Sequence, residues 1–216
     1  MSASIRAIFT KLDQHIPEAA TELEYDGTPY TLLVCVLLSA RSTDLQVNRA
    51  TPSLFKVAKT PEEMVKLGYH TLCTYINSIG LYKTKAKNLI ELSNILISKY
   101  SSKVPEDENE LMSLPGIGIK SAKVLVNILH AKPTIAVDTH VFRVATRLNL
   151  GQSKTREKMS LELEEVLSKE LEHDLLMKAH HLMVLHGRYT CKAIKPNCST
   201  CPIRHLCKWP DKSKFS

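Results

Sequence analysis

The sequence predicts an all-α protein. Apolar residues recur at i, i+3, i+4 and i+7, the spacing of one helix face, in most segments between turn residues. Runs that alternate polar and apolar residues, the pattern of strands, are nearly absent. The last segment, Cys191 to Cys207, has little helical pattern and is organised by its cysteines. We therefore expect a packed helical fold that ends in a cysteine-rich loop.

Composition and charge narrow the class of protein. The 216 residues suffice for one large or two modest domains, and 44% hydrophobic residues indicate a packed core. A formal charge of +7, from 29 Lys and Arg against 22 Asp and Glu, favours a polyanionic partner without establishing one. No run approaches the roughly 20 apolar residues of a membrane span, and the N-terminus lacks the pattern of a secretory signal. An intracellular, reducing compartment without membrane attachment is expected.

Capping and turn residues divide the first part of the chain into helices. Ser4 can cap an amphipathic helix whose apolar stripe is Ile5, Ile8, Phe9 and Leu12. Thr28 and Pro29 fit the N-cap and first residue of a helix that is apolar all round, and we expect that helix to be central. The capping box Thr60-Pro61-Glu62-Glu63 and a stop at Gly68 bound a short helix.

The middle of the chain contains two glycine turns that each precede a helix, without forming an internal repeat. Gly80 precedes a helix with a basic start, and the acidic run after Pro105 begins a short helix that enters the turn Leu114 to Gly118. Another helix then starts near Lys120, with a buried face formed by Ala122, Leu125, Val126 and Leu129. The turn is therefore expected to join two helices.

Three further helices are predicted before the cysteines. Asp138 can cap the first of them, which Gly151 can end. The second carries apolar residues from Leu161 to Leu171, and the third runs from Asp174 to a stop at Gly187.

The turn Leu114 to Gly118 suits contact with phosphate. Glycines let a backbone approach a ligand closely, and N–H groups at a helix start bind anions. A plain tight loop between helices explains the same residues. Nearby lysines favour the phosphate interpretation; they are Lys83, Lys85, Lys87, Lys120 and Lys123.

Two charged residues at helix starts are candidates for chemistry. Lys120 can act as a nucleophile if partial burial and neighbouring cations favour its neutral amine, although most helix lysines are solvated surface charges. Asp138 can stabilise a developing cation through its ionised carboxylate, or it can simply cap the helix that it begins. Spacing alone leaves both choices open.

Four of the six cysteines lie close together with the spacing C-x6-C-x2-C-x5-C; they are Cys191, Cys198, Cys201 and Cys207. Four neighbouring thiolates repel one another unless a cation or cluster neutralises them, so a metal centre is favoured over free thiols or disulfides. The spacing accepts zinc and an iron-sulfur cluster equally. Cys35 and Cys73, in apolar helical patterns, are interpreted as core residues.

These motifs together resemble the endonuclease III family of DNA base-excision glycosylases. The matching segments are Leu114 to Lys120, Val137 to His140, His186 to Cys191, and the four cysteines that end the pattern. The resemblance covers nearly the whole chain, including Leu37 to Ala40 and Ile79 to Tyr82. The order and separation of the motifs make it specific.

The resemblance implies two helical domains that include a helix-hairpin-helix motif. Residues 21–133 would form a six-helix barrel domain with the motif, and residues 1–20 plus 134–216 would form the cluster domain. The four cysteines would hold a 4Fe-4S cluster rather than zinc. The expected partner is double-stranded DNA containing damaged bases or abasic sites, bound by a monomer in a bacterial-type cytoplasm, associated with the nucleoid.

The implied activity is that of a bifunctional DNA glycosylase and abasic-site lyase that removes oxidised pyrimidines in base excision repair. A damaged base would be flipped out of the duplex. Lys120 would attack the sugar C1′, expel the base and form a Schiff base, and β-elimination would then cut the strand. Asp138 would activate the lysine or stabilise positive charge on the sugar.

The implied DNA contacts lie on two parts of the chain. The backbone would be gripped by the turn residues Leu114, Pro115, Gly116, Ile117 and Gly118. Leu81 would help to fill the space left by the flipped nucleotide. Arg41 stands where many members carry a glutamine that probes the opposite strand. Two more residues depart from the family pattern: Ile119, where arginine is frequent, and Met112, where a carboxylate is common. With Arg41, they leave the lesion range open.

Two other functions are compatible with parts of the sequence. A related adenine-mismatch glycosylase generally lacks the lysine and carries an additional C-terminal domain, so Lys120 and the end of the chain at Ser216 argue against it. A non-catalytic iron-sulfur protein that binds DNA or senses redox state needs only the basic charge and the four cysteines, and it leaves Lys120 and Asp138 unexplained.

Overall fold

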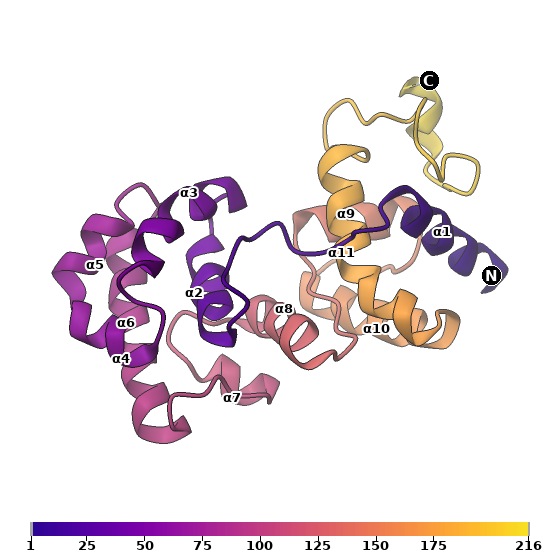
Figure 1. The fold of residues 1–216 in the computed structure, drawn as a ribbon. Helices are drawn as coiled ribbons and strands as arrows, with labels where there is room; N and C mark the ends of the chain where they lie inside the picture. The colour runs from indigo at the N-terminus through magenta and orange to yellow at the C-terminus, as the bar shows by residue number, and fades with distance from the viewer. Residues whose placement is uncertain (1, 216) are drawn as a thin grey trace. The chain divides into compact units, whose positions relative to one another are not determined.

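The structure, a computed structural model, describes residues 2–215 and is built of helices (Figure 1). Across that range it contains no strand, so the predicted all-α fold class is confirmed. None of the described helices is both long and apolar enough to cross a bilayer. The chain divides into two compact units, one of Glu22–His130 and one of Met1–Thr21 with Ala131–Ser216.

The unit of Glu22–His130 contains the helices from α2 to α8. Their bounds are α2 Pro29–Ser39, α3 Asp44–Phe55, α4 Pro61–Leu67, α5 Tyr69–Tyr75, α6 Tyr82–Tyr100, α7 Glu108–Met112 and α8 Ile119–His130. Helix α2 is buried at every residue from Tyr30 to Leu38 and packs against α3, α6 and α8. The sequence-based prediction of a central apolar helix is therefore correct.

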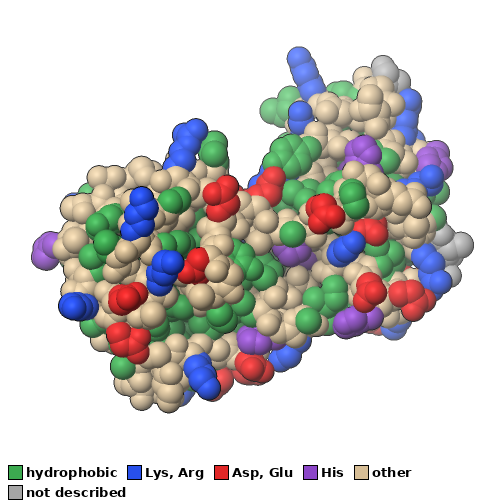
Figure 2. All heavy atoms as spheres, in the orientation of Figure 1, with side chains coloured by type: hydrophobic (Ala, Val, Ile, Leu, Met, Phe, Trp, Pro, Cys, Tyr) green, Lys and Arg blue, Asp and Glu red, His purple; other side chains and the backbone are tan. Residues whose placement is uncertain are grey.

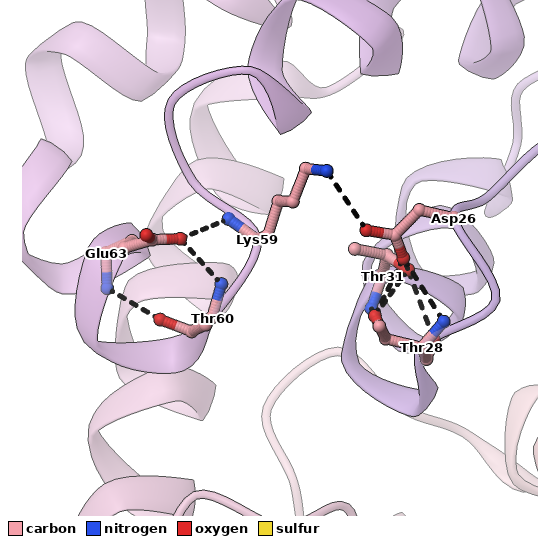
Figure 3. Close-up of polar contacts among 6 residues, drawn as sticks. All are labelled: Asp26, Thr28, Thr31, Lys59, Thr60 and Glu63. Carbon is pink, nitrogen blue, oxygen red and sulfur yellow. Dashed lines mark hydrogen bonds and ion pairs between the residues drawn. The ribbon is translucent and has the colours of Figure 1, made fainter.

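The start of α2 is fixed by an aspartate just before it (Figure 3). Asp26 Oδ1 accepts hydrogen bonds from Thr28 N at 3.1 Å, from Thr28 Oγ1 at 2.8 Å and from Thr31 Oγ1 at 2.5 Å. Asp26 Oδ2 lies 3.5 Å from Lys59 Nζ. The hydrogen bond from Thr31, then those from Thr28, lower the pKa of the Asp26 carboxyl despite its partial desolvation.

The predicted capping box begins α4, also drawn in Figure 3. Thr60 Oγ1 accepts from Glu63 N at 3.2 Å, and Glu63 Oε2 accepts from Thr60 N at 3.2 Å and from Lys59 N at 2.7 Å. Gly68 ends α4 with φ 78°, a left-handed value that favours glycine, as predicted. Because these signals act within a few residues, the sequence alone located them.

The other unit contains α1 Ser2–His15, α9 Thr139–Leu148, α10 Arg156–Glu170, α11 His173–Tyr189 and the 3₁₀ helix η1 Pro210–Phe215. Helix α11 packs against α1, α9 and α10. The apolar stripe of α1 enters this core, where Ile8, Phe9 and Leu12 are buried.

Three predicted helix boundaries in this unit are wrong. Helix α1 begins at Ser2, so Ser4 lies inside it rather than at its cap. Helix α9 ends at Leu148 and is capped by Asn149, a residue with φ 56° whose N–H donates to the Ala145 and Thr146 carbonyls, so Gly151 is not its stop.

Helix α11 also continues through the predicted stop at Gly187 to Tyr189. A Cβ on Gly187 would lie 2.9 Å from His140 Cβ and 3.2 Å from the His140 carbonyl oxygen of α9. The glycine thus permits close packing of two helices rather than ending one.

We expect Gly187→Ala to lower the free energy of unfolding by about 1–3 kcal/mol through overpacking against α9. Helix propensity alone predicts the opposite sign, a gain of roughly 0.5–1 kcal/mol. Urea denaturation of both proteins measures the difference. A variant as stable as the wild type, or more stable, would show that the glycine is not required for helix packing.

Candidate functional site

The predicted glycine turn joins α7 to α8. Leu114 and Ile117 are buried in the core, and Ile117 N donates to the Leu114 carbonyl at 3.1 Å, closing the turn. Pro115 is half-buried, whereas Gly116 and Gly118 are exposed. The apolar side chains therefore anchor the turn and leave its glycine backbone at the surface.

The two glycines of this turn have different surroundings. Gly116 has φ 83°, and a Cβ there would lie 2.8 Å from Asn88 Nδ2 and 3.1 Å from Leu37 Cδ1. A Cβ on Gly118 would meet no atom of residues 2–215 within 4 Å. Gly116 is thus required by the conformation and packing of the turn, while the space beside Gly118 is open to a ligand.

Lys120 and Asp138 occupy the helix starts that the sequence predicts. Lys120 lies in the first turn of α8 and is exposed, so the partial burial expected for a nucleophile is not supplied by its own unit. Asp138 Oδ1 accepts a hydrogen bond from Val141 N at 2.8 Å, which confirms its role as the N-cap of α9. The two residues belong to different units, and their approach to a common pocket stays a prediction.

The lysines expected near phosphate do not form one group. Lys83, Lys87 and Lys120 are exposed, but Lys85 and Lys123 are buried, which corrects the assumption that all five are free for an anion. On the face of the molecule drawn in Figure 2, Lys and Arg side chains are interspersed with Asp and Glu. The net charge alone therefore does not outline a binding surface.

Arg41 and Leu81 share an unusual backbone conformation. Both are exposed and left-handed, with φ 55° at Arg41 and φ 61° at Leu81, the residue that precedes α6. A Cβ on Gly80 would lie 3.6 Å from the Arg41 carbonyl oxygen, so the two turns are neighbours. Left-handed backbone at bulky residues is uncommon and often occurs at functional sites. The sequence pattern did not reveal this strain.

No disulfide links any of the six cysteines, all of which lie within residues 2–215, and the four predicted ligands line a single pocket. Burial, with smaller contributions from the other three thiols, raises the pKa of Cys201 to about 11. Burial and neighbouring thiols also raise the pKa of Cys198. Thiolates so close together need a cationic centre to stay ionised. This donor set fits an iron-sulfur cluster, whose ligands are four thiolates.

A buried histidine also lines the cysteine pocket. His186 Nε2 lies 3.9 Å from Cys201 Sγ, and its Nδ1 has no hydrogen-bond partner among residues 2–215. Sequence patterns gave no sign of this contact, because His186 resembles any core residue of an apolar helix.

Two arginines of α9 hold the start of the cysteine loop. Arg147 Nη1 donates to Cys191 Sγ at 3.3 Å and to the Lys192 carbonyl at 2.8 Å, and the guanidinium stacks 4.0 Å from the centre of the Trp209 ring. Arg143 Nε donates to the Cys191 carbonyl at 2.8 Å. No local sequence pattern indicates either arginine, since Cys191 lies more than forty residues away from both.

Comparison with known proteins identifies the family. Residues 34–169 match the HhH-GPD superfamily of base excision DNA repair proteins, and residues 191–207 match the iron-sulfur binding domain of endonuclease III. Endonuclease III of Rickettsia felis is 47% identical over 205 residues, which are 95% of this chain and 94% of that protein. The Escherichia coli K12 enzyme is 44% identical over 205 residues, 95% of each chain.

The chain belongs to the endonuclease III family. A solved structure of a trapped endonuclease III–DNA covalent intermediate superposes with a TM-score of 0.88 at 40% identity and covers 99% of this chain and 98% of its own. The protein is thus a base excision repair DNA glycosylase with abasic-site lyase activity, built on the helix-hairpin-helix fold with a 4Fe-4S cluster. The predicted family, enzyme class and cofactor are confirmed.

We expect Arg147→Met to accelerate cluster loss about 10- to 100-fold, because groups that support metal ligands contribute that much to retention. The replacement removes the hydrogen bond to Cys191 Sγ and the contact with Trp209. Decay of the visible absorption band in the presence of a chelator measures the rate. Lys192→Met changes an exposed side chain of the same loop and should decay like the wild type; equal rates for all three proteins would contradict the role of Arg147.

Proposed function

We propose that this enzyme removes oxidised pyrimidines from double-stranded DNA and cuts the resulting abasic site through a Schiff base on Lys120. The observation that supports the proposal best is the position of Lys120, exposed in the first turn of α8 directly after a glycine turn with open space beside Gly118. A nucleophile in this position lies close to the turn whose main-chain N–H groups are suited to binding phosphate. We further propose that the enzyme acts as a monomer at the bacterial nucleoid.

Lys120 supplies the nucleophile in this proposal. Its Nζ attacks C1′ of the flipped nucleotide, the bond from C1′ to the base breaks, and the damaged base leaves with the electron pair. Loss of a proton from Nζ and opening of the sugar give the Schiff base. Abstraction of a C2′ proton then breaks the C3′–O bond by β-elimination, and water releases the lysine. The trapped covalent intermediate of an endonuclease III relative supports this route.

Asp138 supplies the negative charge that, in this proposal, complements the positive charge developing on the sugar. Its Oδ1 is held in place by a hydrogen bond from the N–H of Val141 at the start of α9. An ionised carboxylate stabilises positive charge on the sugar as the base leaves, or it receives the proton that Lys120 must lose. The side chain is half-buried, which limits competition from water.

The hairpin grips the DNA backbone through main-chain atoms. The side chains of Leu114 and Ile117 are buried, so these two residues contribute only backbone groups. The first N–H groups of α8 lack partners within the helix, since its first such bond runs from Ala122 N to the Gly118 carbonyl. These N–H groups can donate to phosphate oxygens whatever the base sequence.

Arg41 and Leu81 read the duplex at the flipped nucleotide. Leu81 is 58% exposed at a left-handed position, and its turn neighbours that of Arg41. We assign Leu81 to the space that the nucleotide leaves and Arg41 to the opposite strand. Arginine donates to guanine more readily than to other bases, so this residue bears on the opposite-base preference.

The 4Fe-4S cluster is assigned to the four clustered cysteines, Cys191, Cys198, Cys201 and Cys207. Bound there, the cluster would neutralise their mutual repulsion and shape the loop between α11 and η1. None of the proposed bond-making steps involves it.

We expect sodium borohydride to trap the wild type covalently on duplex DNA with an abasic site or an oxidised pyrimidine, and Lys120→Gln to form no adduct. Reduction converts the Schiff base to a stable amine, and a glutamine amide cannot form one. Denaturing gel electrophoresis measures the adduct. Trapping on an adenine mismatch instead would favour the mismatch glycosylase, and absence of any wild-type adduct would favour a non-catalytic DNA-binding protein.

Lys83→Gln is the matched control for this test. It removes the same charge from an exposed lysine in another helix, and it should weaken DNA binding while leaving the adduct detectable. If Lys120→Gln is trapped as well as Lys83→Gln, another residue is the nucleophile.

The two glycines of the hairpin should separate stability from DNA binding. Gly118→Ala should leave the free energy of unfolding within about 0.5 kcal/mol of wild type, because nothing opposes its Cβ. It should weaken binding to an abasic-site duplex about tenfold by obstructing a phosphate contact. Gly116→Ala should instead lower stability by about 1–2 kcal/mol, since alanine must adopt a left-handed backbone. Urea denaturation and fluorescence anisotropy distinguish the two; normal affinity in Gly118→Ala would exclude this turn from the DNA interface.

A further inference from the structure

Lys85 is a buried lysine that the proposed chemistry does not use. It lies in the first turn of α6 with only 5% of its surface exposed. Its Nζ donates to the Leu38 carbonyl at 2.8 Å and to Ser42 Oγ at 3.0 Å. No carboxylate in residues 2–215 pairs with it. Burial lowers the pKa of its amine, so keeping it in this position opposes the usual preference of lysine for solvent.

The ammonium completes the end of the central helix. The last four carbonyls of a helix have no partners within it. In α2, the Leu37 carbonyl accepts from Ala40 N at 3.3 Å and the Ser39 carbonyl accepts from Ser42 N at 3.0 Å. Lys85 Nζ donates to the carbonyl between them, that of Leu38. A cation at a helix C-terminus is also favoured by the helix dipole.

The same residue connects the two strained turns. Its backbone N–H donates to the carbonyl of left-handed Leu81 at 3.0 Å, while its side chain binds Ser42, the residue after left-handed Arg41. Gly80 brings the turns close together, since its Cβ position lies 3.6 Å from the Arg41 carbonyl oxygen. Backbone strain persists only where surrounding contacts enforce it. Lys85 supplies such contacts to both turns at once.

We propose that Lys85 is a positioning residue that holds the Arg41 and Leu81 turns in register and thereby sets the preference of the enzyme for the base opposite the lesion. This inference rests on the proposed function, in which Arg41 and Leu81 meet the duplex. Lys85 itself touches no DNA, because its amine is buried and occupied by two acceptors of its own chain.

The test measures single-turnover excision of one oxidised pyrimidine placed opposite each of the four bases. The ratio of the fastest to the slowest rate does not depend on how much of each preparation is folded. Lys85→Met keeps the length of the side chain and removes both hydrogen bonds. We expect it to reduce this ratio about five- to tenfold, a coupling typical of residues in contact. Ser42→Ala removes one acceptor while the Leu38 carbonyl still accepts from the buried ammonium. It should reduce the ratio less, which keeps the test decisive if Lys85→Met does not fold.

Lys87→Met is the matched control, because it removes an exposed lysine two residues away in the same helix and should keep the wild-type ratio. Combining Lys85→Met with Arg41→Ala should change the ratio no more than Arg41→Ala alone, since both act through one turn. Equal rates opposite all four bases in the wild type would overturn the inference. So would an unchanged ratio in Lys85→Met, or additive effects of the two replacements. Failure of the wild type to excise the lesion at all would instead refute the proposed function.

Discussion

The fully buried helix α2 imposes the central constraint on the unit of Glu22–His130. Burying its backbone is favourable only if the carbonyls at its C-terminal end find partners, because each unpaired buried carbonyl costs about 1–3 kcal/mol. The chain meets this demand with a turn at Arg41 and with the amine of Lys85 from α6. Leu37, near the C-terminal end of the same helix, packs against the hairpin so closely that a side chain at Gly116 would collide with it. The Arg41 and Leu81 turns, proposed to contact bases, and the hairpin turn, proposed to bind phosphate, thus both pack near the C-terminal end of α2.

This arrangement explains why the exposed elements are mainly backbone. The side chains that determine the shape of the hairpin, Leu114 and Ile117, face the core, and the turn presents glycines to solvent. A rigid apolar anchor beneath an open main-chain surface suits recognition of phosphate, which needs oriented N–H groups and no base specificity. In the proposed function, specificity then depends on the large exposed side chains of Arg41 and Leu81, both at left-handed positions.

Much of the fold could be predicted from the sequence, because its signals are local. The caps at Thr28 and Thr60 and the N-cap at Asp138 each involve partners within five residues, and all three are present. The cysteine spacing also identified the thiols of one pocket, while it did not distinguish zinc from a cluster. The family match was needed for that choice, because both centres accept four thiolates.

Two of the errors concern residues whose roles depend on distant partners. Gly187 was predicted to be a helix stop but is a contact with His140, and Lys85 was counted among the free cations but completes the end of α2. Neither role leaves a trace in the neighbouring sequence. The limit is different for Lys120 and Asp138. Local patterns predict the position of each residue, but they do not show that the two belong to different compact units.

The cysteine loop takes no part in the proposed reaction, but Arg143 links it to the start of α9, the helix that Asp138 caps. Arg143 donates from Nη1 to the Thr139 carbonyl at 3.3 Å and from Nε to the Cys191 carbonyl at 2.8 Å. It therefore connects the first residue of α9, which follows Asp138, to the first cysteine. Its Nη2 also donates to the Gly187 carbonyl at 2.7 Å, at the close contact of α9 and α11. A loop without regular structure holds its shape poorly by itself. Arg143 and Arg147 of α9 fix the start of this loop beside the helix that Asp138 caps, and in the proposed assignment the cluster would fix the remaining cysteines.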